Sequence, residues 1–315
     1  MGRFQIEEVA VRDDVFTKWA LFGPSGSGKT FSALVVATGM AKAFEKKKGR
    51  KPKILLADTE KGRGKYYSDE FEYSYVRFDA PYNPEAFIEL INYAVDQGYD
   101  ILIIDSASHE WSGEGGCLEL QQRAGGTYQA WAKVTPRHNA FIESIAYSPI
   151  HIIATMRGKD QYEVEKDDRG KTNVKKLGVG ATQRDGFEYD FTVSFMLDQK
   201  THTVSVEKDT THVFDNRGSF ILTESDGEKV MNWATSGSGK TPEVRRIEPV
   251  DPEAPDELSA IKDELASTCN ELVKSKKMTI AKLKAFLTEY AGVDMPNQIA
   301  DISVAKQCLE KLKVM

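Results

Sequence analysis

The chain has 315 residues, of which 40% are hydrophobic and 29% charged, an ordinary composition for a globular protein with a substantial core. No apolar run approaches the ~20 residues that cross a bilayer, and the first residues lack the pattern of a signal peptide, so we expect no membrane partner. The net charge of −6 excludes a protein that coats nucleic acid by bulk charge, but it is compatible with a local basic loop.

Alternating apolar runs and helical stretches organise the first part of the chain. The predicted strands are residues 19–22, 53–58, 75–78, 99–105 and 150–155, and the predicted helices are residues 29–45, 84–97 and 128–147. Asn83 followed by Pro84 is typical of a helix start. This alternation predicts an α/β fold with a mostly parallel sheet covered by helices.

The alternation ends after residue 156. Residues 162–165 and 172–174 flank a polar turn at 167–170, which predicts a β-hairpin. Further strands are expected at 187–197, 202–208 and 219–223. We interpret them as an antiparallel extension of the sheet.

The end of the chain has a different character. Residues 235–256 are rich in Gly and Ser and then in Pro and acids, which is typical of a flexible linker. Residues 257–315 show helical spacing of apolar residues in three stretches, with Thr279 and Ser303 as candidate N-caps. The expected organisation is therefore a core at 1–234, the linker, and a small C-terminal helical domain.

A glycine-rich segment lies between the first predicted strand and the first predicted helix. It matches G-x-x-x-x-G-K-[ST] in full, with the residues Gly23, Pro24, Ser25, Gly26, Ser27, Gly28, Lys29 and Thr30. Backbone N–H groups and the helix N-terminus would hold phosphates, Lys29 would reach the β- and γ-phosphates, and Thr30 would ligate Mg²⁺. The segment predicts binding of ATP with Mg²⁺. A similar run at 236–241 has Ala234 at the first glycine position and no helix after it, so we interpret it as linker.

Carboxylates follow two of the predicted strands. The run 101–105 ends in Asp105, which we expect to hold Mg²⁺ through water as a Walker B residue. Hydrolysis also needs a base that orients water, and two carboxylates compete for this role. Glu60 follows the strand 53–58, and Glu110 follows the strand that contains Asp105. Both would lie at the carboxyl edge of the sheet, where ligands bind in open α/β folds.

The phosphate loop, Asp58-Thr59-Glu60 and Ile103-Ile104-Asp105-Ser106 together resemble a RecA-like P-loop NTPase core. More specifically, the chain is similar to phage RecA-like ATPases of the single-strand-annealing recombinase group. The segments that carry this likeness are 109–119, 154–159 and 183–189, and the resemblance covers roughly residues 17–235.

The resemblance implies roles for several residues. Glu60 would be the catalytic base in preference to Glu110, and Thr155 and Arg157 would sense the γ-phosphate. Lys208 would reach the nucleotide of a neighbouring subunit, as one of two lysines does in RecA filaments. The second lysine position is Thr210 here, which puts filament-type activation in doubt. A homo-oligomer is nevertheless expected, in the cytoplasm of the host cell if a phage encodes the chain.

Residues 157–184 form the best local candidate for contact with single-stranded DNA. They hold eight basic and five acidic residues, and Gly178 and Gly180 would make the segment a mobile loop. A solvated surface is the alternative interpretation. The candidate contact residues are Lys159, Arg169, Lys171, Lys175, Lys176 and Arg184. A second candidate is 107–135, where Trp111, Tyr128 and Trp131 could stack on bases or pack in the core.

The leading hypothesis is an ATPase that acts on single-stranded DNA in phage recombination, annealing or replication. A small-molecule or nucleotide kinase shares the phosphate loop but should carry an arginine-rich lid, which the sequence lacks. A nucleotide-gated scaffold without useful turnover is the third hypothesis. We interpret the C-terminal helical domain as an accessory that tunes assembly or as an interaction module for single-strand-binding protein or other replication and recombination proteins.

Overall fold

The computed structural model describes residues 9–166, 172–240, 242, 244–250, 257–275, 278–299 and 301–313. Side chains between residues 160 and 179 lie outside this description. The chain divides into two compact units, Met1–Val250 and Asp251–Met315. Among the described helices, none combines the length and the apolar character that crossing a membrane requires.

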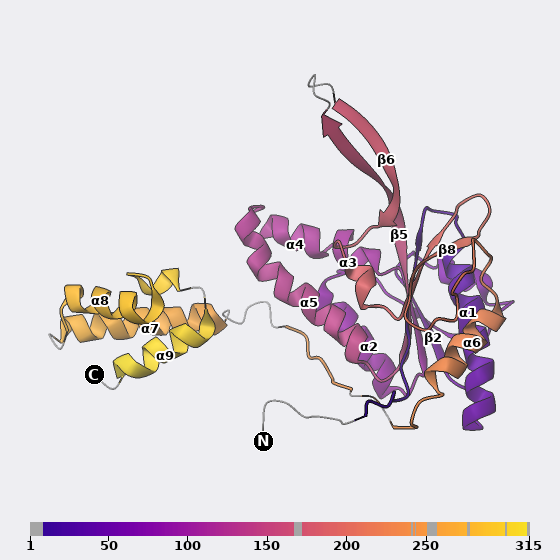
Figure 1. Ribbon diagram of the computed structural model, residues 1–315, viewed down its shortest axis with the longest axis horizontal. Helices are drawn as coiled ribbons and strands as arrows, with labels where there is room; N and C mark the ends of the chain where they lie inside the picture. Colours follow the sequence, from indigo (N-terminus) through magenta and orange to yellow (C-terminus); the bar gives the residue numbers. More distant parts are fainter. Residues whose placement is uncertain are drawn as a thin grey trace. The chain divides into compact units, whose positions relative to one another are not determined.

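An eight-stranded sheet forms the centre of the first unit (Figure 1). Its order is β3-β2-β4-β5-β1-β7-β8, and β6 pairs with β5 beyond this path. The described pairs from β3 to β7 are parallel, whereas β6 and β8 are antiparallel to their neighbours. This confirms the predicted mixed sheet. The strands are β1 (Lys18–Gly23), β2 (Ile54–Asp58), β3 (Ser74–Arg77), β4 (Ile101–Asp105), β5 (His151–Lys166), β6 (Thr172–Ala181), β7 (Val193–Leu197) and β8 (Val204–Asp209).

Helices bury both faces of this sheet. Helices α1 (Lys29–Lys48) and α6 (Glu224–Ala234) pack on one face, and α2 (Pro84–Asp96) and α5 (Trp131–Tyr147) pack on the other. Along β4, Ile101 and Ile103 belong to the first core cluster and the alternate residues to the second. Successive side chains of a strand point to opposite faces, so burial on both faces requires the continuous apolar runs seen in the sequence.

Helix α6 was not predicted, although it completes the first face. Its backbone approaches α1 closely, because a Cβ atom built on Gly227 would lie 2.1 Å from the carbonyl oxygen of Val36. A Cβ atom on Gly39 of α1 would lie 1.9 Å from the carbonyl oxygen of Glu224. Gly227 and several charged residues interrupt the helical spacing of apolar residues in 224–234, so the sequence pattern for a helix was weak there.

Three predictions for residues 187–223 were wrong. Strand β7 is parallel to β1, not antiparallel, because the chain crosses over to the free edge of β1 before it enters β7. Residues 187–190 form the 3₁₀ helix η3 (Phe187–Asp190). The predicted strand 219–223 reduces to a single bridge between Phe220 and Val204. Apolar patterning indicates a strand but carries no information on the direction of its partner.

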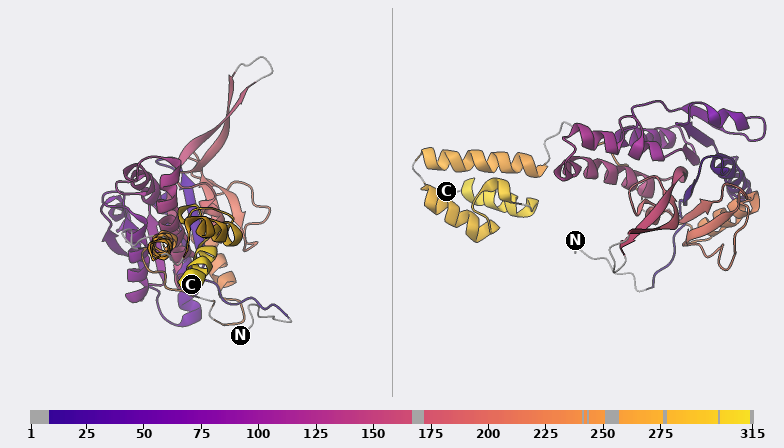
Figure 2. Two further views of the ribbon diagram at one scale, coloured as in Figure 1. Left: turned by 90° about the vertical axis from the view of Figure 1, so that its left-hand side faces the viewer. Right: turned by 90° about the horizontal axis from the view of Figure 1, so that it is seen from above.

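The predicted hairpin is longer than the sequence indicated. The paired part of β5 and β6 runs from Gly158 opposite Ala181 to Lys166 opposite Thr172, and it projects from the sheet (Figures 1 and 2). We call these residues, 158–181, the arm. Gly178 and Gly180 lie in β6, so this part of the predicted mobile loop is a strand. The predicted turn at 167–170 lies outside the described residues.

The second unit contains α7 (Glu257–Lys274), α8 (Ile280–Ala291), the 3₁₀ helix η4 (Pro296–Gln298) and α9 (Ile302–Lys313). Leu265, Leu287 and Leu312 are among the residues of its own hydrophobic core. Thr279 caps α8 by accepting a hydrogen bond from the backbone of Lys282. The cap of α9 is Asp301, whose carboxylate accepts from the backbone of Ser303, so Ser303 is not the cap that the sequence predicted.

Part of the predicted linker 235–256 is held against the first unit. Gly237 donates its backbone N–H to the Asp14 carboxylate, and Arg246 pairs with Asp96 of α2. The segment that resembles a second phosphate loop therefore packs against residues Asp13 and Asp14.

His151 is buried at the start of β5. Its Nδ1 atom accepts a hydrogen bond from the backbone N–H of Thr17 at 3.0 Å. Burial and the neighbouring Lys18 ammonium lower the pKa of His151 to about 3. The neutral ring is therefore favoured in the folded chain, whereas the unfolded chain takes up a proton near pH 6.5.

We expect His151→Asn to flatten the acid limb of the stability profile, because Asn supplies an acceptor that does not titrate. The folded-state pKa is depressed, so the contribution of His151 is complete above pH ~6.5 and is lost as pH falls towards 3. The unfolding free energy of the wild type should fall by about 1.4 kcal/mol per pH unit more than that of the variant in this window. Urea unfolding at stepped pH measures it, and parallel profiles would contradict this role of His151.

Candidate functional site

The phosphate loop connects β1 to α1 at the carboxyl edge of the sheet. Gly26 and Gly28 adopt φ angles of 80° and 88°, in the left-handed region that favours glycine. Gly23 is required for a different reason, because a Cβ atom there would lie 2.6 Å from the carbonyl oxygen of Leu197 on β7. The loop therefore curls tightly and leads directly into the N-terminus of α1.

Lys29 folds back over this loop. Its ammonium group donates hydrogen bonds to the carbonyl oxygens of Gly23 at 2.9 Å and of Pro24 at 2.8 Å. Burial lowers the pKa of Lys29, while Asp105 and Glu60 act in the opposite direction. A phosphate group in the loop would offer this partly desolvated ammonium a stronger, charged acceptor.

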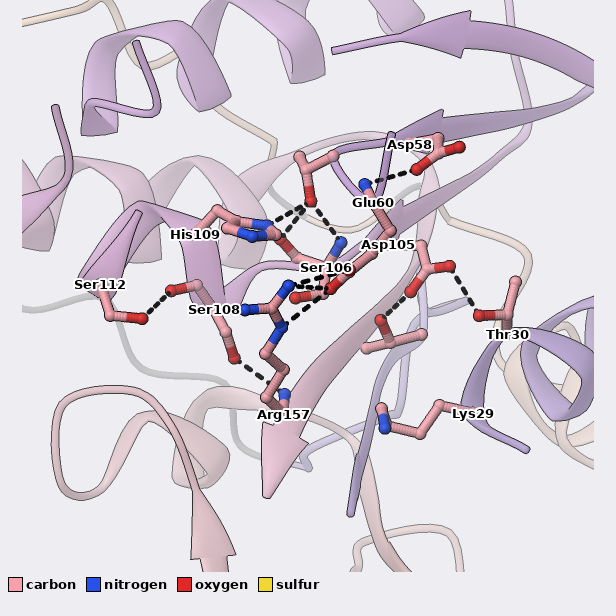
Figure 3. Close-up of polar contacts among 12 residues, drawn as sticks. Lys29, Thr30, Asp58, Glu60, Asp105, Ser106, Ser108, His109, Ser112 and Arg157 are labelled. Atoms are coloured by element: carbon pink, nitrogen blue, oxygen red, sulfur yellow. Dashed lines mark hydrogen bonds and ion pairs between the residues drawn. The ribbon is translucent and has the colours of Figure 1, made fainter. Parts of the chain in front are cut away.

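Asp105 ends β4 as a buried carboxylate (Figure 3). One oxygen accepts from the Thr30 hydroxyl at 2.7 Å, and the other accepts from the Thr155 hydroxyl. Burial raises the pKa of Asp105, and the two threonine hydrogen bonds offset part of this increase. The structure thus brings Thr30, Asp105 and Thr155 together. Thr155, which was expected to sense the γ-phosphate, contacts Asp105 and does not line the cavity described below.

Glu60 lies two residues beyond the end of β2, and Arg157 of β5 holds its carboxylate. The guanidinium donates from Nε and from one terminal nitrogen to the two carboxylate oxygens, at 2.9 and 2.8 Å (Figure 3). Burial raises the pKa of Glu60, but the hydrogen bonds and charge of Arg157 outweigh this and leave the pKa below its ordinary value. While this pair persists, Glu60 is a weak base.

Thr59 and His109, to which the sequence assigned no role, orient this segment. The hydroxyl of Thr59 accepts from the backbone N–H of Ser106 at 2.7 Å and lies 2.6 Å from Nδ1 of His109. The His109 ring stacks on Tyr82. The loops that follow β2 and β4 are therefore joined immediately behind Glu60.

A cavity of about 600 Å³ opens over the phosphate loop. The 3₁₀ helix η1 (Arg63–Tyr67) forms one wall, with the exposed ring of Tyr66 and the adjacent Tyr67. Sequence reasoning missed this wall, whose only signal was two tyrosines shortly after Glu60. The other lining residues are Ser25, Gly26, Gly28, Lys29, Thr30, Glu60, Asp105, Arg157 and Gly158.

Glu110, the competing base, lies elsewhere. It is fully buried and does not line the cavity. One of its oxygens accepts from Cys117 Sγ at 3.0 Å and from His138 Nδ1 at 2.9 Å, and the other accepts from Gln183 Nε2 at 3.0 Å. Glutamate, cysteine and histidine can all bind metals, but here the carboxylate is satisfied by three donors. Gln183 lies just beyond β6, so this network anchors the base of the arm.

The residues of the loop fit a magnesium nucleotide. The hydroxyl of Ser27 is buried without a hydrogen-bond partner among the described residues. It lies in the loop before the N-terminus of α1, where backbone N–H groups and the helix dipole favour a phosphate. The Thr30 hydroxyl and the Asp105 carboxylate offer the hard oxygen ligands that Mg²⁺ prefers.

The predicted DNA contacts distribute along the arm and its base. Lys159 on β5 and Arg184 after β6 are exposed. Lys175 and Lys176 lie on β6, where side chains are not described, and Arg169 and Lys171 lie outside the described residues. Trp111 and Trp131 stack on each other, with ring centroids 5.3 Å apart, whereas Tyr128 is exposed.

Lys208 does not join the site within one chain. It lies on β8 opposite Ser194 near the start of β7, and its ammonium donates to the carbonyl oxygen of Tyr189. It does not line the cavity.

A comparison with curated proteins finds no match to the chain. A family model described as an AAA domain matches residues 16–225. The match includes the phosphate loop, Asp105, Glu60 and Arg157, and it covers most of the first unit. The chain therefore belongs to the AAA-domain family of P-loop NTPases.

Proposed function

We propose that this AAA-domain protein is a RecA-like ATPase that acts on single-stranded DNA in phage recombination, annealing or replication. The observation that carries the proposal is the contact between Arg157 and Glu60. Arg157 immediately precedes the arm, so one residue connects the candidate DNA-binding element to the candidate catalytic carboxylate.

The cavity supplies the groups that ATP hydrolysis needs. Lys29 would exchange its hydrogen bonds with the loop carbonyl oxygens for contacts with the β- and γ-phosphates. Tyr66 offers an exposed ring that could stack on the adenine of ATP. Mg²⁺ held at Thr30 and Asp105 would offset the negative charge of the transferred phosphoryl group. Glu60 would orient the attacking water and accept its proton.

Arg157 would control when Glu60 can act. Its guanidinium lines the cavity and binds Glu60, so a γ-phosphate in the cavity competes with Glu60 for the same cation. Release of Arg157 removes the group that lowers the pKa of Glu60, and the carboxylate becomes a better base. Strain on the arm from bound DNA would favour the same release.

The base of the arm is tied to the site at two points. The backbone N–H of Arg157 donates to the Ser108 hydroxyl at 2.9 Å, and Gln183 donates to the carbonyl oxygen of Ala107 at 3.2 Å. Both partners lie just after Asp105. A shift of the arm on binding DNA would therefore be transmitted to the segment that follows Asp105.

We further propose that the protein works as a homo-oligomer, with Lys208 facing a neighbouring subunit's nucleotide, and that the second unit binds partner proteins such as single-strand-binding protein.

We expect ATP turnover by the full chain to rise at least several-fold when single-stranded DNA is added. Binding of the strand should weaken steeply as salt increases, because lysines and arginines on the arm displace counterions from phosphates. Turnover and fluorescence anisotropy measured over a salt series test both points. Turnover that is independent of DNA of every length would contradict a DNA-stimulated ATPase, and the absence of turnover with intact ATP binding would favour the nucleotide-gated scaffold.

Substitutions of the two competing carboxylates should separate catalysis from stability. Glu60→Gln should lower turnover about 10²–10⁴-fold without weakening ATP binding, since it removes the base and leaves Arg157 available to the γ-phosphate. Glu110→Ala should instead lower the unfolding free energy by about 2–4 kcal/mol, because His138 and Gln183 lose their buried acceptor. Turnover, ATP binding and urea unfolding of both variants are the measurements. If Glu110→Ala abolishes turnover without a loss of stability, the base assignment is wrong.

A further inference from the structure

A second basic segment lies where α1 ends and β2 begins. Residues 46–53 contain six cations in eight positions and no acid, which is a larger local excess of positive charge than the arm carries. All six cationic residues are exposed, namely Lys46, Lys47, Lys48, Arg50, Lys51 and Lys53. We call this segment the basic corner.

The basic corner lies at the opposite edge of the sheet from the phosphate loop. Strands β1, β5, β4 and β2 are mutually parallel in order, so the residue before β2 and the loop after β1 mark opposite edges. Helix α1 connects them with 20 residues, a length of about 30 Å. Figure 1 shows the arm on the side of the sheet where the strands end and α1 running away from it.

Intramolecular pairs satisfy only half of the basic corner. Arg50 pairs with Asp100 through two hydrogen bonds, and Lys51 pairs with Glu72. The ammonium group of Lys53 donates to the carbonyl oxygen of Gln97. Lys46, Lys47 and Lys48 make no ion pair among the described residues. Cations in the last turn of a helix stabilise it by interacting with the helix dipole. This effect is worth only about 0.3–1 kcal/mol and is confined to the last turn.

The chemistry of the basic corner fits phosphates and not bases. Residues 46–53 include no aromatic side chain and the preceding Phe44 is buried, so the segment exposes no aromatic ring for base stacking. Long, flexible ammonium groups without fixed partners are suited to contacts with a phosphate backbone that carry no sequence information.

We propose that the basic corner binds the phosphate backbone of a nucleic acid duplex without sequence preference. This surface is separate from the arm and from the nucleotide cavity. The inference goes beyond the proposed function, because it requires neither hydrolysis nor binding of a single strand by the arm. A chain with both surfaces can hold two segments of nucleic acid at once, at opposite edges of the same sheet.

The test is duplex binding by the full chain without nucleotide, using the triple variant Lys46→Gln, Lys47→Gln, Lys48→Gln. Duplex affinity at low salt should fall about tenfold, and the slope of log affinity against log salt should become shallower by about 3, one unit for each lost phosphate contact. Basal ATP turnover should not change. The matched control, Lys240→Gln, Lys274→Gln, Lys282→Gln, removes three exposed lysines elsewhere and should keep wild-type affinity and slope.

A second variant guards against effects on folding. The triple variant Lys46→Arg, Lys47→Arg, Lys48→Arg retains the charges and should keep both the affinity and the slope of the wild type. Duplex affinity and slope equal to wild type in the glutamine variant would overturn the proposal. Binding of polyglutamate by the wild type, as tight as its binding of duplex and lost in the same variant, would also overturn it, because the partner would then be an acidic protein.

Discussion

The buried carboxylate of Asp105 is the constraint around which the first unit is organised. Removing an ionised carboxylate from water is costly unless hydrogen bonds replace the lost hydration. Thr30 from α1 and Thr155 from β5 provide those bonds. The same two hydroxyls fix the phosphate loop and the start of the arm relative to β4. The candidate nucleotide site is thereby assembled from three elements that are distant in sequence, namely α1, β4 and β5.

Near Asp105, the carboxylate of Glu60 forms an ion pair with the guanidinium of Arg157. The side chain of Arg157 is 50% exposed and that of Glu60 is 18% exposed, so solvent screens the pair and it costs little to break. A partly exposed ion pair of this kind can change partners when a phosphate enters the cavity. Glu110 contrasts with Glu60, because its buried oxygens have three fixed donors and cannot move without leaving them unpaired. Glu60 lines the cavity over the phosphate loop, whereas Glu110 supports the base of the arm.

The sequence was sufficient to place the phosphate loop and Asp105, because their chemistry demands fixed residue types beside a buried strand. Local patterns could not decide between Glu60 and Glu110, since both follow predicted strands and only packing distinguishes a lining residue from a buried one. The preference for Glu60 came from the resemblance alone. The parallel direction of β7 and the close contact of α1 with α6 at Gly39 depend on tertiary neighbours that no local pattern specifies. Arg63, Tyr66 and Tyr67 line the cavity through the path of a short 3₁₀ helix, which periodicity does not reveal. The cationic run at 46–53 was visible in the sequence, but only the fold shows that it faces away from the nucleotide site.

We propose that Arg157 withholds Glu60 until nucleotide and DNA are both present. The most direct measurement is a structure of the full chain with Mg²⁺, a non-hydrolysable ATP analogue and single-stranded DNA. It should show Lys29 on the phosphates, the Arg157 guanidinium on the γ-phosphate analogue, and Glu60 free of Arg157 and facing a water. A structure in which phosphates fill the loop while Arg157 remains paired with Glu60 would contradict the account.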